Sequence, residues 1–267
     1  MRLSVIIPVY NCAPYLRACL DSVCAAAEAT DSFSVEVICV DDGSTDGSGE
    51  VLDEFARRRA STSSTCIFKV IHQANKGEGE ARNAGLDIAG GDYLAFADAD
   101  DVLEPTAFAD AAKLIAQNPD ATFVALGLQE LSDKEGKDGS CKIEVWTDAD
   151  DIPLRLAMTS VVQMFLRRDR VGDLRFPRYS MGADRVYAYR VARRAKKIVL
   201  CDTVGYRYRV HATSASHSQR SLRKRWDDFR HAAHVLAILL VTPQSGWRIR
   251  LRYVRASGEK LLRFLGV

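Results

Sequence analysis

The sequence predicts an α/β fold in which helices flank a mostly parallel sheet, with a helical extension at the C-terminus. The first half of the chain alternates short apolar runs with longer stretches of helical periodicity. Polar or acidic residues directly follow four of these apolar runs. The extension is expected because residues 219–267 are rich in Lys and Arg and carry apolar residues at helical spacing.

This alternation defines the expected elements in order. Buried strands are expected at residues 3–9, 35–40, 67–71, 93–97 and 122–126. Helices are expected between them at residues 14–29, 47–59, 77–88 and 105–117. Strands that alternate with helices pair in parallel through right-handed crossovers, and their ligands bind beyond the carboxyl ends. The residues immediately after each strand are therefore candidates for a functional site.

The second half of the chain lacks such clear alternation. Residues 132–139 are polar and contain glycine, which indicates a loop. Residues 148–208 are expected to form irregular structure and helices that complete a cleft. Two further helices are expected at 222–240 and 247–265, separated by a break at 243–246.

Composition and cysteine spacing restrict the class of protein. Hydrophobic residues make up 47% of the chain and charged residues 27%, which is typical of a globular protein and not of a disordered or fibrous one. The seven cysteines include no CxxC pair, so neither a zinc site nor a disulfide framework is expected. The N-terminal apolar run is too short for a signal peptide, and no run could span a bilayer. A reducing, cytoplasmic location is therefore favoured.

Polar groups at the ends of four successive strands are expected to meet at one edge of the sheet. They occupy residues 8–11, 41–46, 75–77 and 98–101. A cluster of acidic groups is unfavourable unless a metal ion or a basic ligand neutralises it. One isolated Asp-Gly-Ser cluster is more often a turn with a helix cap. The prediction of a site thus depends on all four occurring together.

The motif Asp98-Ala99-Asp100 is a candidate metal site. Carboxylate oxygens suit Mg²⁺ or Mn²⁺, which proteins commonly hold through one or two carboxylates and the phosphates of a substrate. Such an ion would stabilise the negative charge on a departing nucleoside diphosphate. The same tetrapeptide recurs at residues 148–151, where it follows no buried strand, and there a capped helix N-terminus is expected instead.

A glycine-rich segment at residues 77–82 is similar to a dinucleotide-binding fingerprint, because it follows a strand and opens a helix. It comes after the third strand, however, and Arg82 occupies a position that requires Gly or Ala. A nicotinamide or flavin site is therefore not expected. Lys76 and Arg82 are either contacts to a nucleotide base or phosphate, or solvated helix charges.

These motifs, taken in order, resemble the successive signatures of the family 2 glycosyltransferases. The matching segments are residues 5–11 (VIIPVYN), 40–46 (VDDGSTD), 75–77 (NKG), 81–85 (ARNAG) and 98–101 (DADD). The resemblance implies the GT-A fold, which is Rossmann-like. It also implies a UDP-sugar donor, a divalent metal ion and transfer with inversion at the anomeric carbon.

The resemblance assigns roles in donor binding. The implied donor-binding residues are Pro8, Tyr10, Asp41, Lys76, Arg82, Asp98 and Ala99. Among them, Asp41 would contact the uracil with help from Arg82 and Lys76. Pro8 and Tyr10 would line the nucleoside pocket, and Asp98 would meet the ribose or the metal.

The resemblance also assigns the metal ligands and the catalytic base. Asp100 would bind the metal together with Asp98, and His211 is a candidate third ligand unless it is a surface loop histidine. Asp184, at the position of the family's Glu-Asp motif, would be the base. The usual Glu is Ala183 here, which departs from the family pattern. Pairing of Asp184 with a neighbouring arginine is the alternative to a catalytic role.

The expected domain is residues 1–218, with a nucleotide-sugar-binding half at 1–130 and an acceptor and catalytic half at 131–218. Residues 219–267 would form a basic helical extension, with eleven Lys and Arg against three Asp and Glu from Arg220 onward. This tail would contact an anionic membrane at its inner face or pack as helices with a solvated basic face.

The expected partners are a nucleotide-sugar donor and a glycan or lipid-linked acceptor, with no nucleic acid. Two other functions remain open. One is a nucleotide-sugar-binding scaffold with weak or no catalysis, suggested by Ala183. The other is a nucleotidyltransferase, although the segment after the first strand is not the glycine-rich, basic loop that this chemistry needs.

Overall fold

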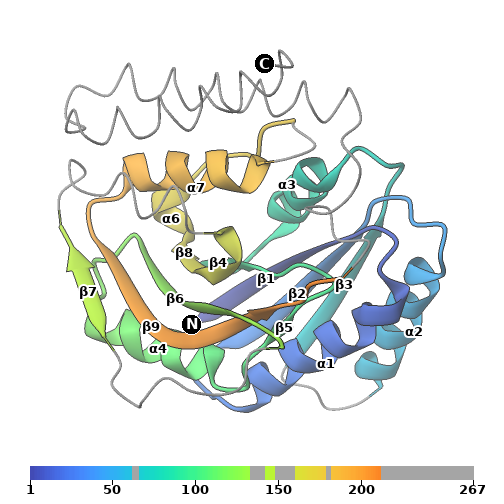
Figure 1. Cartoon of the computed structure of the whole chain (residues 1–267), viewed down its shortest axis with the longest axis horizontal. Helices are drawn as coiled ribbons and strands as arrows, with labels where there is room; N and C mark the ends of the chain where they lie inside the picture. The colour runs from blue at the N-terminus through green and yellow to red at the C-terminus, as the bar shows by residue number, and fades with distance from the viewer. Residues whose placement is uncertain (62–65, 133–141, 148–159, 179–181, 212–267) are drawn as a thin grey trace.

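The computed structural model of the chain describes residues 1–61, 66–132, 142–147, 160–178 and 182–211. Its centre is one nine-stranded sheet with the order β3-β2-β1-β4-β8-β6-β9-β5, and β7 pairs with β9 off this path (Figure 1). The strands are β1 (Arg2–Val9), β2 (Ser34–Asp41), β3 (Cys66–His72), β4 (Tyr93–Phe96), β5 (Val102–Leu103), β6 (Phe123–Glu130), β7 (Ile143–Trp146), β8 (Met164–Arg167) and β9 (Ile198–Tyr208).

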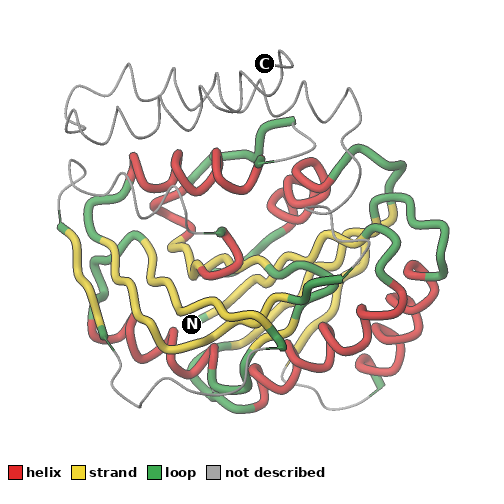
Figure 2. Tube along the Cα trace, in the orientation of Figure 1, coloured by secondary structure: helices red, strands yellow, loops and turns green. Residues whose placement is uncertain are grey.

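Helices cover both faces of this sheet. They are α1 (Ala13–Glu28), α2 (Ser48–Ala60), α3 (Glu78–Ile88), α4 (Ala107–Gln117), α6 (Arg168–Val171) and α7 (Ala183–Arg194), with a short 3₁₀ helix, η1 (Val161–Gln163). Figures 1 and 2 show α1, α2 and α4 along one face and α3, α6 and α7 on the other. The predicted α/β class with a helix-flanked sheet is confirmed.

The first half follows the sequence closely, except that β3, at the edge of the sheet, is only partly buried and not buried as expected. β1, β2 and β4 are buried on both faces, which is why they are continuous apolar runs in the sequence. The order β3-β2-β1-β4 is parallel throughout, with Val9 opposite Asp41 and Ile6 opposite Phe96. Beyond β4 the sheet is mixed, because β8 is antiparallel to both β4 and β6. Cys39 and Cys66 are buried, as expected of small hydrophobes.

The expectation of irregular structure and helices at residues 148–208 is only partly right for the described part. The helices α6 and α7 are present, but two strands, β8 and β9, were not expected. β8 has only four residues, and β9 is interrupted by polar residues and Gly205, so neither forms a long apolar run. β9 is held mainly by pairing with β6, far away in the sequence.

Several expectations fall outside the described residues. They are most of the loop at 132–139, the second acidic tetrapeptide at 148–151, and the C-terminal helices at 222–240 and 247–265 with their break at 243–246. Within the described part of the chain, no helix combines the length and the apolar character that crossing a membrane requires.

Candidate active site

The ends of β1, β2 and β4 lie at one edge of the sheet because these strands run parallel and in register. The segments that follow them are joined by hydrogen bonds. Asn11, which has a φ of 52°, accepts a hydrogen bond from the backbone N–H of Thr45 at 2.8 Å and donates its own N–H to Ser44 Oγ at 3.1 Å. The loops after β1 and β2 therefore fix each other, and Tyr10, half exposed, lies at the rim of this edge.

Asp46 completes the link between these two loops. One carboxylate oxygen accepts the N–H of Ala13 at 3.0 Å, at the start of α1, and the other accepts the hydroxyl of Ser48 at 2.6 Å. Ser48 Oγ in turn accepts the N–H of Cys12 at 2.9 Å. The backbone N–H of Ser48 also donates to Asp46, at 3.0 Å, so these bonds satisfy backbone donors at the starts of both α1 and α2.

Asp41, at the end of β2, is buried with both carboxylate oxygens in hydrogen bonds. Oδ1 accepts the N–H of Ser44 at 2.9 Å, and Oδ2 lies 2.9 Å from Nδ1 of His72. Burial alone would raise the pKa of Asp41, but the hydrogen bonds from Ser44 and His72 outweigh it and lower the pKa. Asp41 is thus an ionised acceptor, suited to an N–H donor of a ligand.

Asp42 organises the loop between β3 and α3, a role the motifs in the sequence did not single out. It is buried, and its two oxygens accept the N–H groups of Lys76 at 2.9 Å and Gly77 at 2.7 Å. The side-chain amide of Gln73 donates a third bond at 2.7 Å. The side chain of Lys76 is exposed, so both its predicted ligand contact and its alternative as a solvated charge stay open.

Arg82 is not a solvated helix charge, because only 2% of it is exposed. One guanidinium nitrogen, Nη2, lies 2.6 Å from Asp98 Oδ1 and 2.5 Å from Glu78 Oε1, and the group stands over the ring of Phe176. Its neighbours thus lie in the segment after β4, on α3 and, for Phe176, in the segment before α7. The structure brings Arg82 together with Asp98, two strands away from Asp41.

The Asp98–Asp101 segment follows β4, and its carboxylates face different partners. Burial raises the pKa of Asp98, opposed by Arg82 and reinforced by the neighbouring carboxylates. Asp101 accepts the hydroxyl of Tyr206 at 2.8 Å and the N–H of Arg209 at 2.8 Å. Burial raises the pKa of Asp101 to about 6 despite these bonds.

Tyr206, on β9, holds this segment in place through two hydrogen bonds, although it lies more than 100 residues away in the sequence. Its hydroxyl accepts the N–H of Asp98 at 2.9 Å while donating to Asp101. Asp101 and Tyr206 are therefore site residues to which the sequence analysis gave no role. Asp101 belongs to the acidic tetrapeptide at 98–101, and Tyr206 belongs to the segment YRYRVH at 206–211, whose alternating Tyr and Arg are the signal that could have found it.

His211 lies beside Asp100, with Nε2 2.9 Å from Oδ2. Its ring packs on Tyr15 at a centroid distance of 4.6 Å, and the guanidinium of Arg209 stands over the Tyr15 ring, 5.1 Å from its centroid. The His211 side chain is 14% exposed, so it is not a surface loop histidine. An imidazole nitrogen and a carboxylate oxygen are both ligands that suit Mn²⁺.

No group of three or more His, Cys, Asp and Glu residues with the geometry to hold a metal ion occurs in the described ranges. The reason is that Asp98 faces Arg82, whereas Asp100 faces His211. The pair of Asp100 and His211 nevertheless fits a divalent ion that takes its remaining ligands from phosphate oxygens and water.

Asp184 lies in the first turn of α7, which begins directly after Gly182, a residue with a φ of 77°. Its charge helps to raise the pKa of Arg82, so Asp184 lies near the buried guanidinium that Asp98 contacts. Arg178 pairs instead with Glu80 at 3.2 Å. No ion pair within the described part of the chain joins Asp184 to Arg178 or to Arg185.

Ala183, where the family has Glu, is buried between α7 and α3. A methyl group built on Gly79 of α3 would lie 3.5 Å from the Ala183 side chain and 2.9 Å from the carbonyl oxygen of Pro177. The two helices thus approach closely at small residues. A longer side chain at position 183 would have to leave this contact.

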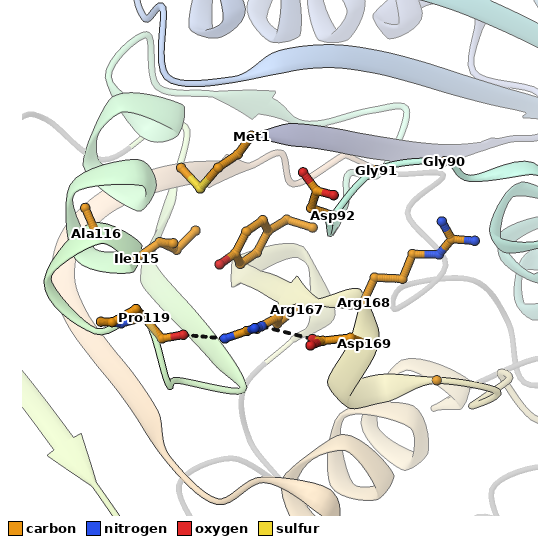
Figure 3. A pocket seen from close by; sticks show the side chains of 12 residues that line it. Met1, Gly90, Gly91, Asp92, Ile115, Ala116, Pro119, Arg167, Arg168 and Asp169 are labelled. Atoms are coloured by element: carbon orange, nitrogen blue, oxygen red, sulfur yellow. Dashed lines mark hydrogen bonds and ion pairs between the residues drawn. The ribbon is translucent and has the colours of Figure 1, made fainter.

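A separate cavity of about 900 Å³ lies at the opposite end of β4. Its lining includes Asp92 and Tyr93 at the start of that strand, and Arg167 at the end of β8 (Figure 3). Arg167 bridges the carbonyl of Pro119 and the carboxylate of Asp169. Because ligands of such sheets bind beyond the carboxyl ends of the strands, the acidic edge and not this cavity is the candidate active site.

Comparison with known proteins gives consistent results. A family model described as glycosyl transferase family 2 matches residues 4–141. The chain is 38% identical over 105 residues to the uncharacterized glycosyltransferase EpsJ of Bacillus subtilis, which covers 39% of this chain and 28% of that protein. It is 27% identical over 213 residues to a poly(ribitol-phosphate) beta-glucosyltransferase of Bacillus spizizenii, covering 79% of this chain and 32% of that protein.

A solved structure, residues 1–349 of Staphylococcus aureus TarS in complex with UDP-GlcNAc, has the same fold. The TM-score is 0.72 at 20% identity, covering 100% of this chain and 73% of that one. The GT-A type of fold is thereby confirmed. The matches span about a third or less of the length of the two curated relatives. Since the family model matches just over half of the residues, the chain belongs to glycosyl transferase family 2.

Proposed function

We propose that the chain transfers a sugar from a nucleotide diphosphate donor, specifically a UDP-sugar, to a hydroxyl group of a glycan or lipid-linked acceptor. The observation that carries the proposal is the ionised, buried Asp41 at the same sheet edge as the Asp98–Asp101 segment. Family membership supports the reaction class. The complex of TarS with UDP-GlcNAc supports a uridine donor, and the name poly(ribitol-phosphate) beta-glucosyltransferase supports an acceptor used in polysaccharide assembly.

The donor would lie across the ends of β1, β2 and β4. Asp41 would accept the N–H of the uracil, next to Pro8 and Tyr10, with Lys76 reaching in from the loop before α3. Asp98 would meet the ribose together with the backbone at Ala99. Arg82 would act here by holding Asp98 in place, since it is buried against that carboxylate.

Asp100 and His211 would hold Mn²⁺ or Mg²⁺, with Asp98 as the further candidate ligand. When bound, the ion supplies positive charge to the diphosphate as it leaves. The chain's own contribution is to place these metal ligands beside the site that would bind the nucleotide-sugar. The bonds of Tyr206 to Asp98 and Asp101 support a fixed position for the intervening Asp100.

Asp184 would be the base that removes the proton from the acceptor hydroxyl as that oxygen attacks the anomeric carbon. A direct displacement inverts the anomeric centre and needs one carboxylate base. The position of Asp184 near the Arg82–Asp98 pair, at the start of α7, supports this role.

A matched pair of variants tests the metal assignment. Asp100→Ala should abolish metal-dependent binding of UDP while the fold is retained, and Asp150→Ala, in the second tetrapeptide, should leave binding intact. Calorimetry with UDP and Mn²⁺ measures both. Equal losses in the two variants would overturn the assignment of Asp100.

Ala183 is the observation that favours a second function, a nucleotide-sugar-binding scaffold without efficient catalysis. Incubation with a panel of UDP-sugars, Mn²⁺ and water separates the candidates. Slow release of UDP supports the transferase, and binding without turnover supports the scaffold. Release of pyrophosphate would support a nucleotidyltransferase.

We further propose that residues 1–218 form the catalytic domain, divided at about residue 130, and that 219–267 form a basic extension. This extension would contact an anionic membrane from the cytoplasmic side, where lipid-linked acceptors are reached. The excess of Lys and Arg after Arg220 supports it.

A further inference from the structure

His72 lies between two carboxylates that belong to different elements. At the end of β3, its Nδ1 is 2.9 Å from Asp41 Oδ2 on β2, and its Nε2 is 3.1 Å from Asp53 Oδ1 on α2. A neutral imidazole has one N–H donor, whereas the imidazolium has two. Only the protonated ring can donate a hydrogen bond to both carboxylates at once.

The Asp41 side of this bridge is closely packed, whereas the side chains of His72 and Asp53 are 47% and 55% exposed. A methyl group built on Gly49, in the first turn of α2, would lie 3.0 Å from Asp41 Oδ2 and 3.5 Å from the His72 ring. Within the described part of the chain, Asp41 and Asp53 are the charged groups that face the ring. Their hydrogen bonds, against a smaller opposing effect of burial, raise the pKa of His72.

We propose that His72 is a positioning residue that fixes and keeps ionised the Asp41 carboxylate for the nucleobase, so that donor affinity depends on the protonation of His72. The inference rests on the proposed function, because it assumes that Asp41 meets the base. A carboxylate has about four lone-pair sites, and hydrogen bonds from the backbone N–H and hydroxyl of Ser44 and from His72 occupy some of them. For this role, a remaining site must accept an N–H of uracil.

The arrangement predicts the direction of the pH dependence. At low pH the imidazolium bridges Asp41 and Asp53, and Asp41 keeps its orientation and charge. As the pH rises through the pKa of His72, the ring loses one donor and must break or weaken one of the two bonds. Affinity for a uridine nucleotide should then fall, by roughly three- to tenfold, the scale of one hydrogen bond.

The variant Asp53→Asn tests whether the protonation of His72 matters, because a purely structural role of His72 would not shift the pH profile of UDP binding. The asparagine can still accept the bond from Nε2, but the negative charge is gone, so the pKa of His72 falls. UDP affinity, measured by calorimetry with Mg²⁺ between about pH 5.5 and 8.5, should be close to wild type at the acidic end. The decline should begin at lower pH than in wild type. The titration of UDP itself is common to both proteins and cancels in the comparison.

Two further variants complete the experiment. Glu54→Gln, an exposed carboxylate on the same helix that pairs with Arg17, should leave the wild-type profile unchanged. His72→Gln should weaken binding and flatten the profile, and in an Asp41→Asn background it should have little further effect, because His72 acts through Asp41.

The outcomes separate this inference from the proposed function. UDP binding whose pH profile is the same in wild type and Asp53→Asn overturns the role of His72 and leaves the uridine donor in place. Absence of UDP binding by the wild-type protein at every pH overturns both. Losses in His72→Gln and Asp41→Asn that simply add would also overturn the proposal that His72 acts through Asp41.

Discussion

Asp184 lies in the first turn of α7, where its charge acts on the buried Arg82. Asp184→Asn keeps the size and polarity of the side chain but removes its ability to take a proton. We expect this variant to retain its affinity for a UDP-sugar and Mn²⁺ and to lose about 10²- to 10⁴-fold in transfer rate, the usual scale for a general base. Single-turnover transfer and calorimetry measure the two quantities separately.

Asp173→Asn is a suitable control for this prediction. Asp173 is exposed, pairs with Arg194 at 2.9 Å, and lies on the segment before α7. Its loss should change neither binding nor rate. A wild-type rate in Asp184→Asn would mean that Asp184 is not the base, and the scaffold function would then be favoured.

Sequence reasoning was most successful for residues whose role follows from a short motif at a strand end. Asp41, Asp98 and Asp100 lie at one edge because parallel strands in register bring their ends together. The partners of these residues could not be predicted in the same way. That Arg82 is buried against Asp98, and that His211 faces Asp100, depends on contacts between segments 16 and 111 residues apart.

At the scale of elements, α3 packs on β1 so closely that it requires glycine. A methyl group built on Gly85 would lie 2.5 Å from Cγ2 of Ile6, which is fully buried in β1. Gly85→Ala should therefore destabilise the protein by about 1–2 kcal/mol, since overpacking costs more than the helix gains from alanine. Urea unfolding monitored by circular dichroism measures the change.

A double variant shows whether the contact itself is responsible. Ile6→Ala removes the methyl group that Gly85→Ala would strike, at the cost of a cavity. In the Ile6→Ala background, the added methyl at position 85 should be neutral or stabilising. An equal penalty in both backgrounds would contradict a clash with Ile6.

Elements were predicted well where local signals agreed with the fold. α1 to α4 and the strands β1 to β4 appear within about two residues of their expected bounds, the usual uncertainty of helix ends, whereas β6 extends to Glu130, four residues past its expected end. β8 and β9 were missed because their stability comes from non-local pairing. β9 carries Tyr206 and leads to His211. Part of the candidate site therefore lies on a strand that could not be predicted from the sequence.

At the scale of the whole molecule, the basic extension at 219–267 remains a prediction about how the catalytic domain reaches its acceptor. The full-length protein should sediment with anionic vesicles at low salt and be released at high salt, because the attraction is electrostatic. A chain shortened to residues 1–218 should stay in the supernatant. If the full-length protein ignores anionic vesicles at low salt, the proposed membrane contact is wrong.

The end of the sheet opposite the candidate site contains a buried acid that should govern stability at low pH. Glu36, 5% exposed, accepts hydrogen bonds from Ser4 Oγ at 2.6 Å, Gly90 N–H at 2.6 Å and Lys69 Nζ at 2.7 Å. Burial alone would raise the pKa of Glu36, but these three donors outweigh it and lower the pKa to about 2.

The sign of the effect follows from this lowered pKa. Because the folded protein binds a proton at Glu36 less readily than the unfolded chain does, the stabilisation is fully present above the unfolded pKa of about 4.5. It is lost as the pH falls from there toward 2, by on the order of 3 kcal/mol. Glu36→Gln should therefore be less stable than wild type at pH 7, and its unfolding free energy should fall less between about pH 5 and 3. Urea unfolding across this range measures both, with the exposed Glu54→Gln as control; parallel curves for Glu36→Gln and wild type would contradict the assignment.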